Sequence, residues 1–317
     1  MTNPDRPAAD PAALLDAARA GSRPALARLL SYVERGGAGA AVVGRLTHPL
    51  GGNAYTIGIT GSPGAGKSTL TNALCGEVRR SGSTVAVLAI DPSSPFSGGA
   101  ILGDRIRMGD HSLDAGVFIR SMATRGHLGG LALATPAAIR LLDAVGTPWV
   151  IVETVGVGQV EVEVAGAADT TVVVVNPGWG DAVQANKAGL MEIADVFVIN
   201  KADRTGAADT RRDLEQMLSL QVSEGWRPTI VETAALEGRG IDLLWRAIGE
   251  HRRHVTATGE LELRRARRVR DELRAIVAAR LAERAGVVAE GPRFDAAVSA
   301  ILARTDDPWH AAGELIG

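Results

Sequence analysis

The chain has 317 residues, of which 46% are hydrophobic and 22% are charged, and these fractions exclude a disordered or a fibrous protein. The 34 Lys and Arg and the 36 Asp and Glu give a formal net charge of −2, and aromatic residues make up only 3%. The composition therefore argues against a nucleic-acid or membrane-surface protein, which would need a general basic field or a set of stacking rings.

The single cysteine, Cys75, excludes an intrachain disulfide, and no spacing of Cys and His suits a zinc site. The first residues lack the basic start and apolar run of a signal peptide, and no long uncharged apolar stretch predicts a transmembrane helix. We therefore expect a cytoplasmic protein. Glycine alone is unusual, because 38 of 317 residues (38/317, about 12%) exceed the average of roughly 7% without a collagen-like period.

The N-terminal segment has the pattern of short helices. Asp10 supplies an N-cap oxygen before a proline at the first helical position, and Ser22 is the N-cap of a second helix that runs towards Glu34. Glycines then break the helical pattern, at Gly36, Gly37 and Gly39. Residues 1–50 are therefore predicted to form a helical N-terminal extension.

Beyond this extension the sequence contains short apolar runs that end in Gly, Pro, Asp or Asn. The runs lie at Thr56–Thr60, Thr84–Ile90, Trp149–Val152, Thr171–Val175 and Val196–Ile199. Uninterrupted β-branched runs are typical of strands that are buried on both faces of a parallel sheet. Helical patterns separate most of them, at Thr69–Arg80, Pro136–Val145, Ala182–Glu192 and Thr210–Leu220. We predict an α/β fold, a doubly wound and mainly parallel sheet, over residues 51–251.

After about Arg252 the composition becomes rich in Arg and Glu. A long amphipathic helix is predicted over Leu261–Arg284, because apolar residues recur there every three or four positions. These residues are Leu263, Ala266, Val269, Leu273, Ile276 or Val277, and Leu281. The helix either packs on its own domain or dimerises, whereas nucleic-acid binding is disfavoured because glutamates are interleaved with the arginines. Residues 252–317 form the predicted C-terminal helical arm.

A phosphate-binding loop follows the first predicted strand. The pattern GxxxxGK[ST] occurs in the required strand, loop and helix setting, which favours a bound nucleotide over a ligand-free glycine turn. Its residues are Gly61, Ser62, Pro63, Gly64, Ala65, Gly66, Lys67, Ser68 and Thr69. The glycines let backbone N–H groups approach phosphate oxygens, and the following helix adds its positive end. Lys67 would reach the β- and γ-phosphates, and the Ser68 hydroxyl would bind Mg²⁺.

A second motif selects the base. Asn200, Lys201 and Asp203 form an NKxD set directly after the last predicted strand, at the carboxyl edge of the sheet where ligands bind. The carboxylate of Asp203 only accepts hydrogen bonds, and guanine offers it N1–H and the 2-amino group, whereas adenine has no proton on N1. Lys201 would cover the base while Asn200 braces the loop. Behind a phosphate loop, this motif predicts a preference for GTP over ATP.

Acidic residues follow two other predicted strands. Asp91 comes after Thr84–Ile90, and Glu153 comes after Trp149–Val152. Ordinary GTPases have Asp-x-x-Gly at the second place, with the carboxylate acting on Mg²⁺. Here Glu replaces that Asp, and an N-cap or a surface acid is the alternative for Glu153. Gln159 is a candidate for positioning the hydrolytic water, and a group from a partner or from a moving switch is an equal alternative.

The sequence resembles one protein family in five segments. The segments are GSPGAGKST, DPSSPFSGGAILGDRIRM, ETVGVGQ, NPGWGDAVQANKAG and NKAD, in this order. The family is the MeaB/MMAA type of GTPases in the SIMIBI class, whose members were once labelled ArgK or lysine/arginine/ornithine transport ATPases. The resemblance extends from about Ala12 to the C-terminus.

The resemblance implies a SIMIBI-type P-loop G domain with a helical N-terminal extension and a C-terminal arm that forms a homodimer. It also implies a GTP-hydrolysing chaperone that uses GTP/GDP and Mg²⁺. The implied partner is an adenosylcobalamin-dependent acyl-CoA mutase, foremost methylmalonyl-CoA mutase, whose cofactor loading the chaperone gates and which it protects or reactivates. No nucleic acid and no membrane is implied as a partner.

The resemblance further implies that Mg²⁺ is coordinated or positioned by Ser68, Asp91, Asp104 and Glu153. Asn176–Lys187 resembles the family's third switch, in which Gln184 and Lys187 are the functional polar residues. This chain has Trp179 in that switch, where many relatives have Ala.

The usual SA-type loop that contacts the base lacks its Ser in this chain, where the sequence reads Thr233, Ala234, Ala235 and Leu236. Backbone N–H groups at Ala235 and Leu236 could still meet the guanine O6.

A nickel-insertion GTPase is the alternative nearest in fold, but the six histidines form no metal relay beside one cysteine. An ATP-driven kinase or transport ATPase is disfavoured by NKxD, and a non-enzymatic dimeric scaffold predicts no hydrolysis.

Overall fold

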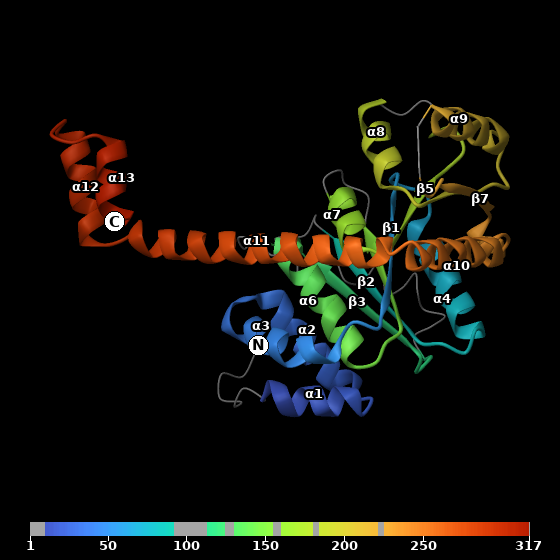
Figure 1. Ribbon diagram of the computed structural model, residues 1–317, viewed down its shortest axis with the longest axis horizontal. Helices are drawn as coiled ribbons and strands as arrows, with labels where there is room; N and C mark the ends of the chain where they lie inside the picture. Colours follow the sequence, from blue (N-terminus) through green and yellow to red (C-terminus); the bar gives the residue numbers. More distant parts are fainter. Residues whose placement is uncertain are drawn as a thin grey trace.

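A computed structural model describes residues 10–91, 113–123, 130–154, 160–179, 184–220 and 225–316 of the chain. In these residues the central sheet has seven strands in the order β3-β2-β4-β1-β5-β6-β7 (Figure 1). The strands are β1 (Tyr55–Gly61), β2 (Val85–Asp91), β3 (Val117–Ala123), β4 (Trp149–Thr154), β5 (Thr170–Val175), β6 (Val196–Asn200) and β7 (Thr229–Thr233). Every neighbouring pair is parallel, so the predicted doubly wound α/β fold is confirmed.

All five predicted strands are present, and their ends differ from the prediction by at most two residues. The prediction missed β3 and β7, which form the two edges of the sheet. The four helices predicted between the strands are also present, as α4 (Lys67–Arg80), α6 (Gly130–Ala144), α8 (Gln184–Ile193) and α9 (Ala207–Ser219). Among the helices that pack on the sheet, α7 (Val160–Ala167) and α10 (Ile241–Ala257) were not predicted.

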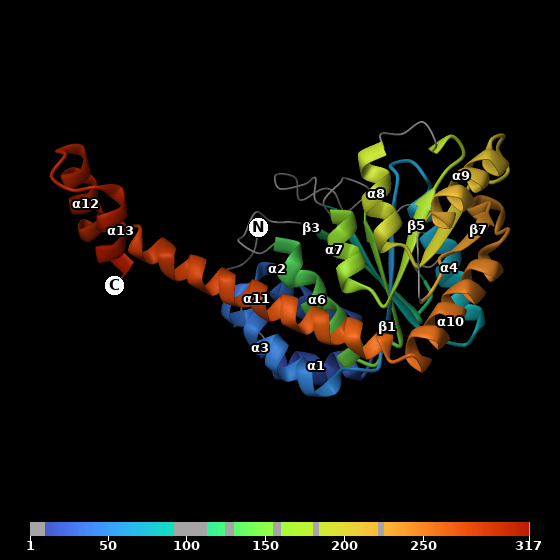
Figure 2. The ribbon, with the colours of Figure 1, turned by 45° about the horizontal axis from the view of Figure 1, so that its top comes forward.

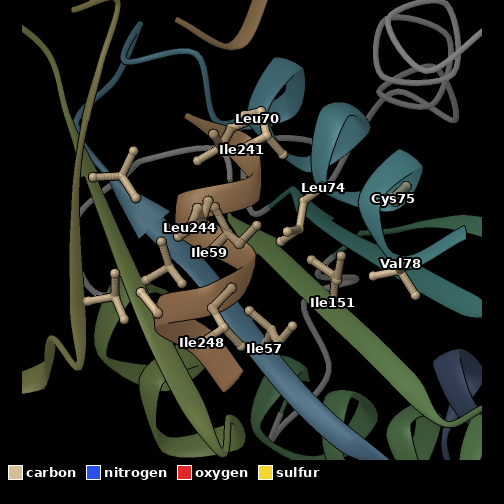
Figure 3. Packing of buried hydrophobic residues seen from close by; sticks show 14 of the residues in the cluster. Ile57, Ile59, Leu70, Leu74, Cys75, Val78, Ile151, Ile241, Leu244 and Ile248 are labelled. Atoms are coloured by element: carbon tan, nitrogen blue, oxygen red, sulfur yellow. The ribbon is translucent and has the colours of Figure 1, made fainter. Parts of the chain in front are cut away.

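Helices α4 and α10 cover one face of the sheet. Figure 3 shows Leu70 and Leu74 of α4 and Leu244 and Ile248 of α10 packed against the central strand β1. These side chains are fully buried, as expected for strands that are apolar on both faces. This packing fixes the start of α4, and therefore the phosphate loop, relative to β1.

The other face of the sheet is covered by α6, α7, α8 and α9, and the N-terminal helices lie outside α6. These are α1 (Pro11–Arg19), α2 (Arg23–Arg35) and α3 (Gly37–Thr47), followed by the short helix η1 (His48–Leu50). The predicted caps are present, because Asp10 Oδ1 accepts from Ala12 N at 3.2 Å and Ser22 Oγ accepts from Ala25 N at 3.4 Å. The expectation that three glycines end the helical region is wrong, since α3 contains two of them.

The predicted long helix is α11 (Glu260–Val288), and it is followed by α12 (Pro292–Leu302) and α13 (Pro308–Ile316). Figures 1 and 2 show α11 leaving the body as one straight rod, with α12 and α13 at its far end. Of the two arrangements left open by the sequence, packing on the chain's own body applies only to the first part of α11, which contacts α6. No helix in the described ranges combines the length and the apolar character that crossing a membrane requires.

The N-terminal part of α11 is attached to the amino ends of β5 and β6 by ion pairs with two buried carboxylates. Arg264 contacts Asp195 with both of its terminal nitrogens at 2.9 Å, and the same carboxylate lies 3.1 Å from Nε2 of the buried His251. Arg265 and Arg268 both pair with Asp169. Burial alone would raise the pKa of both carboxyl groups, but the hydrogen bonds from His251 and Arg264 to Asp195, and the charges of Arg268 and Arg265 beside Asp169, hold each pKa below its ordinary value.

We expect Asp195→Asn to lower the free energy of unfolding at pH 7 by about 3–5 kcal/mol, because the change removes the buried negative charge that Arg264 pairs with. A carboxyl group whose pKa is depressed by folding stabilises the protein above its unfolded pKa of about 3.9 and loses this effect as the pH falls through its folded pKa. The difference between wild type and variant in urea unfolding should therefore shrink under strongly acidic conditions. Asp209→Asn is the control, since its pair with Arg212 is exposed and should change stability by less than about 1 kcal/mol. Equal effects of the two variants would contradict this account.

Candidate functional site

The predicted site residues gather at the carboxyl edge of the sheet. The phosphate loop follows β1, Glu153 lies in the last part of β4, and the NKxD residues follow β6. Strand β1 lies between β4 and β5, and Ile59 pairs with Glu153 in the register of β1 and β4. Parallel strands end at one edge, so the fold brings the phosphate loop together with two segments that lie more than 80 residues after it in the sequence.

Two glycines of the phosphate loop combine a positive φ with a close neighbour. Gly61 has a φ of 126°, and a Cβ at this position would overlap the backbone of Val174 in β5. Gly66 has a φ of 88°, and its Cβ would lie 2.6 Å from Nδ2 of Asn200. Positive φ values strain any residue with a side chain, so a substitution at either glycine would displace the loop from β5 or from Asn200.

Lys67 is the first residue of α4, and its side chain is buried under the loop. The ammonium donates to the carbonyl oxygens of Gly61 at 2.7 Å and of Ser62 at 3.0 Å. Backbone carbonyls thus hold a positive charge inside the turn that the loop forms. This arrangement can present the ammonium to an anion in the concave side of the loop.

A hydroxyl and a carboxylate meet beside Lys67. Ser68 Oγ donates to Glu153 Oε1 at 2.6 Å, and the Glu153 side chain is only 3% exposed. Two oxygen atoms of these types, held close together, suit a hard cation such as Mg²⁺. A solvated surface acid, one alternative for Glu153, is contradicted by its burial. Across the described ranges, no three or more His, Cys, Asp or Glu side chains cluster as a metal site.

Asn200 connects three loops at this edge. Its Nδ2 donates to the carbonyl of Ala65 at 2.8 Å, and its Oδ1 accepts from Thr233 Oγ1 at 3.0 Å and from Ala235 N at 3.2 Å. The phosphate loop, the NKxD turn and the segment after β7 are therefore fixed to one buried amide. The sequence did not predict the contribution of Thr233. Thr233 lies opposite Asn200 in the register of β6 and β7, and this register could not be foreseen because β7 was not predicted.

The other residues that the sequence predicts to contact the base follow Asn200 directly or lie in the loop after β7. Lys201 has a φ of 60°, and its ammonium donates to the carbonyl of Gly64 at 2.7 Å, so its side chain lies over the phosphate loop. Asp203 is exposed. Ala234 and Ala235 are buried, and Leu236 is exposed at the start of the short helix η4 (Ala235–Glu237).

Several predicted residues cannot be placed in this geometry. Asp104 and Gln159 lie outside the described residues. The backbone of Asp91 ends β2, and the backbones of Gln184 and Lys187 lie in α8, but their side chains lie outside the described part. In the predicted third switch, Trp179 is buried and packs in the hydrophobic cluster of α8 and α9.

The chain is similar to several known proteins. The family model described as "Methylmalonyl Co-A mutase-associated GTPase MeaB" matches residues 26–290. A protein of Pyrococcus horikoshii named as a GTPase is 49% identical over 303 residues, which cover 94% of this chain and 95% of that protein. The GTPase ArgK of Escherichia coli is 44% identical over 219 residues, 68% of this chain and 66% of ArgK. The crystal structure of a LAO/AO transport system kinase is 31% identical with a TM-score of 0.71, over 99% of this chain and 98% of that one.

Proposed function

Because the chain belongs to the MeaB family of GTPases, we propose that it is a GTP-driven chaperone of an adenosylcobalamin-dependent acyl-CoA mutase. In this proposal it gates adenosylcobalamin loading and protects or reactivates the mutase, with methylmalonyl-CoA mutase as the first client to test. The observation that carries the proposal is the buried side-chain amide of Asn200, which hydrogen-bonds the phosphate loop and the loop after β7 from within the NKxD motif. The family match over residues 26–290 adds the mutase to this nucleotide site.

The nucleotide roles follow from the chemistry of the side chains. Lys67 and the N–H groups of the phosphate loop bind the β- and γ-phosphates and stabilise the charge that develops when water attacks the γ-phosphate. Asp203 accepts the two hydrogen bonds that guanine donates, and Lys201 lies along the base. The backbone N–H of Leu236 serves the guanine O6 in place of the missing serine side chain, since the N–H of Ala235 donates to Asn200 Oδ1.

The donor set around Ser68 fits Mg²⁺, because the buried carboxylate of Glu153 already lies at hydrogen-bond distance from the hydroxyl. Bound there, Mg²⁺ would neutralise charge on the transferring phosphate. We assign Ser68 and Glu153 to its site, together with Asp91 at the end of β2 and Asp104. Glu153 also holds the Ser68 hydroxyl in place at the start of α4.

Hydrolysis is proposed to change the conformation of the switch segments. Gln159 follows β4 and is the candidate for positioning water. Asn176–Lys187, with Gln184 and Lys187, is the candidate third switch that reports the nucleotide state to the mutase.

The proposed domain organisation is a helical extension over residues 1–50, the G domain over 51–251 and a dimerising arm over 252–317.

The mutase proposal is tested by co-purification. We expect a tagged chain to retain methylmalonyl-CoA mutase, with a retained amount that differs between GTP and GDP, and to make adenosylcobalamin transfer to the mutase depend on GTP. The matched control is Lys67→Met, which should transfer cofactor at the same low rate with either nucleotide. Equal retention and equal cofactor loading with GTP, GDP and no nucleotide would contradict the chaperone proposal while leaving the GTPase assignment intact.

A further inference from the structure

A cavity lies between the sheet and the N-terminal part of α11. It has a volume of about 570 Å³ and is partly open to solvent. Thr56 of β1 and Ile90 of β2 line it from the sheet, α6 and α7 line its sides, and α11, which contacts α6, covers it (Figure 2). Its volume lies in the range of roughly 300–1,000 Å³ that is typical of small-molecule sites.

The inner surface of the cavity is mainly apolar. Apolar side chains come from the sheet and from all three helices, at Ile90, Pro136, Ile139, Val164, Val269 and Ala275. Thr56 and Thr135 add two hydroxyl groups to the lining, and both residues are buried. Apolar walls with a few uncharged polar groups favour a ligand that has an apolar body and one small neutral polar group.

The charged side chains that α11 contributes to the edge of the cavity are paired within the chain. Arg265 and Arg268 both pair with Asp169, which directly precedes β5. Glu272 pairs with Arg140 of α6. These ion pairs connect α11 to α6 and to the start of β5, so they hold the covering helix of the cavity in place.

The two other carboxylates of the described lining have partners as well. Asp143 accepts from the backbone N–H groups of Asn53 at 3.2 Å and of Ala54 at 2.9 Å, and Asp271 accepts from Arg274 at 3.1 Å. A charged ligand would have to break one of these pairs or enter without a counter-ion, and a charge without a partner away from water is unfavourable. An uncharged ligand avoids both costs.

The length of the cavity favours a chain-shaped molecule. Its lining on α11 extends from Arg265 to Ala275, and ten residues at about 1.5 Å each give a rise of about 15 Å. This length is about half of the roughly 30 Å hydrocarbon core of a bilayer, and therefore matches one layer of acyl chains. The volume agrees, because it is roughly four times the 150 Å³ of an apolar cavity that binds benzene.

We propose that this cavity binds an uncharged medium-chain lipid, with one alkyl chain and a small neutral head group. The alkyl chain contacts Ile139, Val164 and Val269, and the hydroxyl of Thr56 or Thr135 bonds to the head group. The site is separate from the nucleotide site, since its described lining contains no residue of the phosphate loop or of the NKxD set. Because α6, α7 and α11 all line the cavity, a bound lipid would hold the arm against the G domain.

The first test compares three probes of equal chain length, 1-decanol, decanoate and decylammonium, by calorimetry on the full chain with GDP bound. We expect 1-decanol to bind with a stoichiometry of one. Decanoate and decylammonium should bind at least about tenfold more weakly, because neither charge finds an unpaired partner at the cavity. No binding of 1-decanol, or equal affinities for the three probes, would overturn the proposal.

A cavity-filling variant asks whether the alcohol occupies this cavity. Gly166 of α7 belongs to the lining, and apart from its own helix backbone and chain neighbours a Cβ there would meet no atom within 4 Å. Gly166→Leu should therefore fold, bind GDP as the wild type does and lower the affinity for 1-decanol at least about tenfold, because its side chain takes up space in the cavity.

The matched control is Gly286→Leu, at an equally open glycine of α11 beyond the cavity, which should leave the affinity for 1-decanol unchanged. Wild-type affinity in Gly166→Leu would overturn the assignment to this cavity.

Photolabelling locates the bound chain independently of any variant. A 1-decanol analogue that carries a diazirine on its chain is bound, activated by light and mapped by mass spectrometry of peptides. We expect labels on α6 and on α11 between residues 265 and 275. The exposed side chains of Leu281 and Val287, farther along α11, offer a competing apolar surface. Labels confined to that part of α11 or to α12 and α13 would overturn the cavity site.

Discussion

Replacing Lys67 by alanine should reduce GTP turnover at least about 10²–10³-fold and abolish its coupling to a mutase. Removing one group that stabilises developing charge in a transition state typically costs this much, and the buried ammonium of Lys67 is the positive charge that the phosphate loop itself encloses. Phosphate release from GTP, measured with and without a mutase, tests the expectation. Undiminished turnover would contradict the assignment of the phosphate loop.

Two controls separate the charge of Lys67 from its packing. The ammonium also bonds to the carbonyls of Gly61 and Ser62, so a truncated side chain could disturb the loop. Lys67→Met keeps the apolar stem without the charge and should lose as much turnover as alanine does. Arg239→Ala, at an exposed side chain after η4, should keep wild-type turnover. An active methionine variant would mean that the stem, not the charge, is what the reaction needs.

The central strands could be predicted because their burial is visible locally. In β5, for example, six consecutive residues from Thr170 to Val175 are buried, which gives an uninterrupted apolar and β-branched run. Strand β3 lacks such a run, since Arg120 and Ser121 interrupt it. The guanidinium of Arg120 is accommodated by a long-range contact, an ion pair of 2.7 Å with Glu34 of α2. A sequence pattern cannot show that a partner 86 residues away makes a charged strand residue acceptable.

The helix that follows α2 could not be predicted from its glycines, for a related reason. Gly36 has a φ of 71° and does end α2, as the pattern indicates. The chain then starts α3 at once, and a Cβ on Gly39 would lie 2.8 Å from the ring of Tyr32. Glycine at this position therefore permits close packing of α3 on α2, which is a tertiary role that helix propensity alone does not reveal.

The candidate site also has one part that the sequence predicts and another that depends on the fold. The phosphate loop and the NKxD set are contiguous in sequence, and their side-chain chemistry could be interpreted from the motifs alone. The bonds that join them could not, because Asn200 reaches Ala65 across 135 residues and Thr233 across 33. These contacts exist only once β1, β6 and β7 end at one edge of the sheet, so they follow from the fold and not from any local pattern.

Asp203→Asn should weaken GTP binding about 10²–10³-fold and leave ATP binding nearly unchanged. The carboxylate accepts hydrogen bonds with both oxygens, whereas an asparagine amide directs N–H groups at one of the two donors of guanine. A site built to bond a polar group rejects a mismatched partner by several kcal/mol, because the unmatched donors lose their bonds to water. Xanthine nucleotides carry a carbonyl in place of the 2-amino group, so the variant should bind them better relative to GTP than the wild type does.

Calorimetry with GTP, ATP and xanthosine triphosphate distinguishes this expectation from a general loss of binding. Asp209→Asn, at an exposed acid on α9, is the matched control and should change none of the three affinities. An equal loss for all three nucleotides in Asp203→Asn would mean that the residue supports the loop and does not read the base. Tighter binding of ATP than of GTP by the wild type would contradict the guanine assignment itself, since no arrangement of an accepting carboxylate favours the unprotonated N1 of adenine.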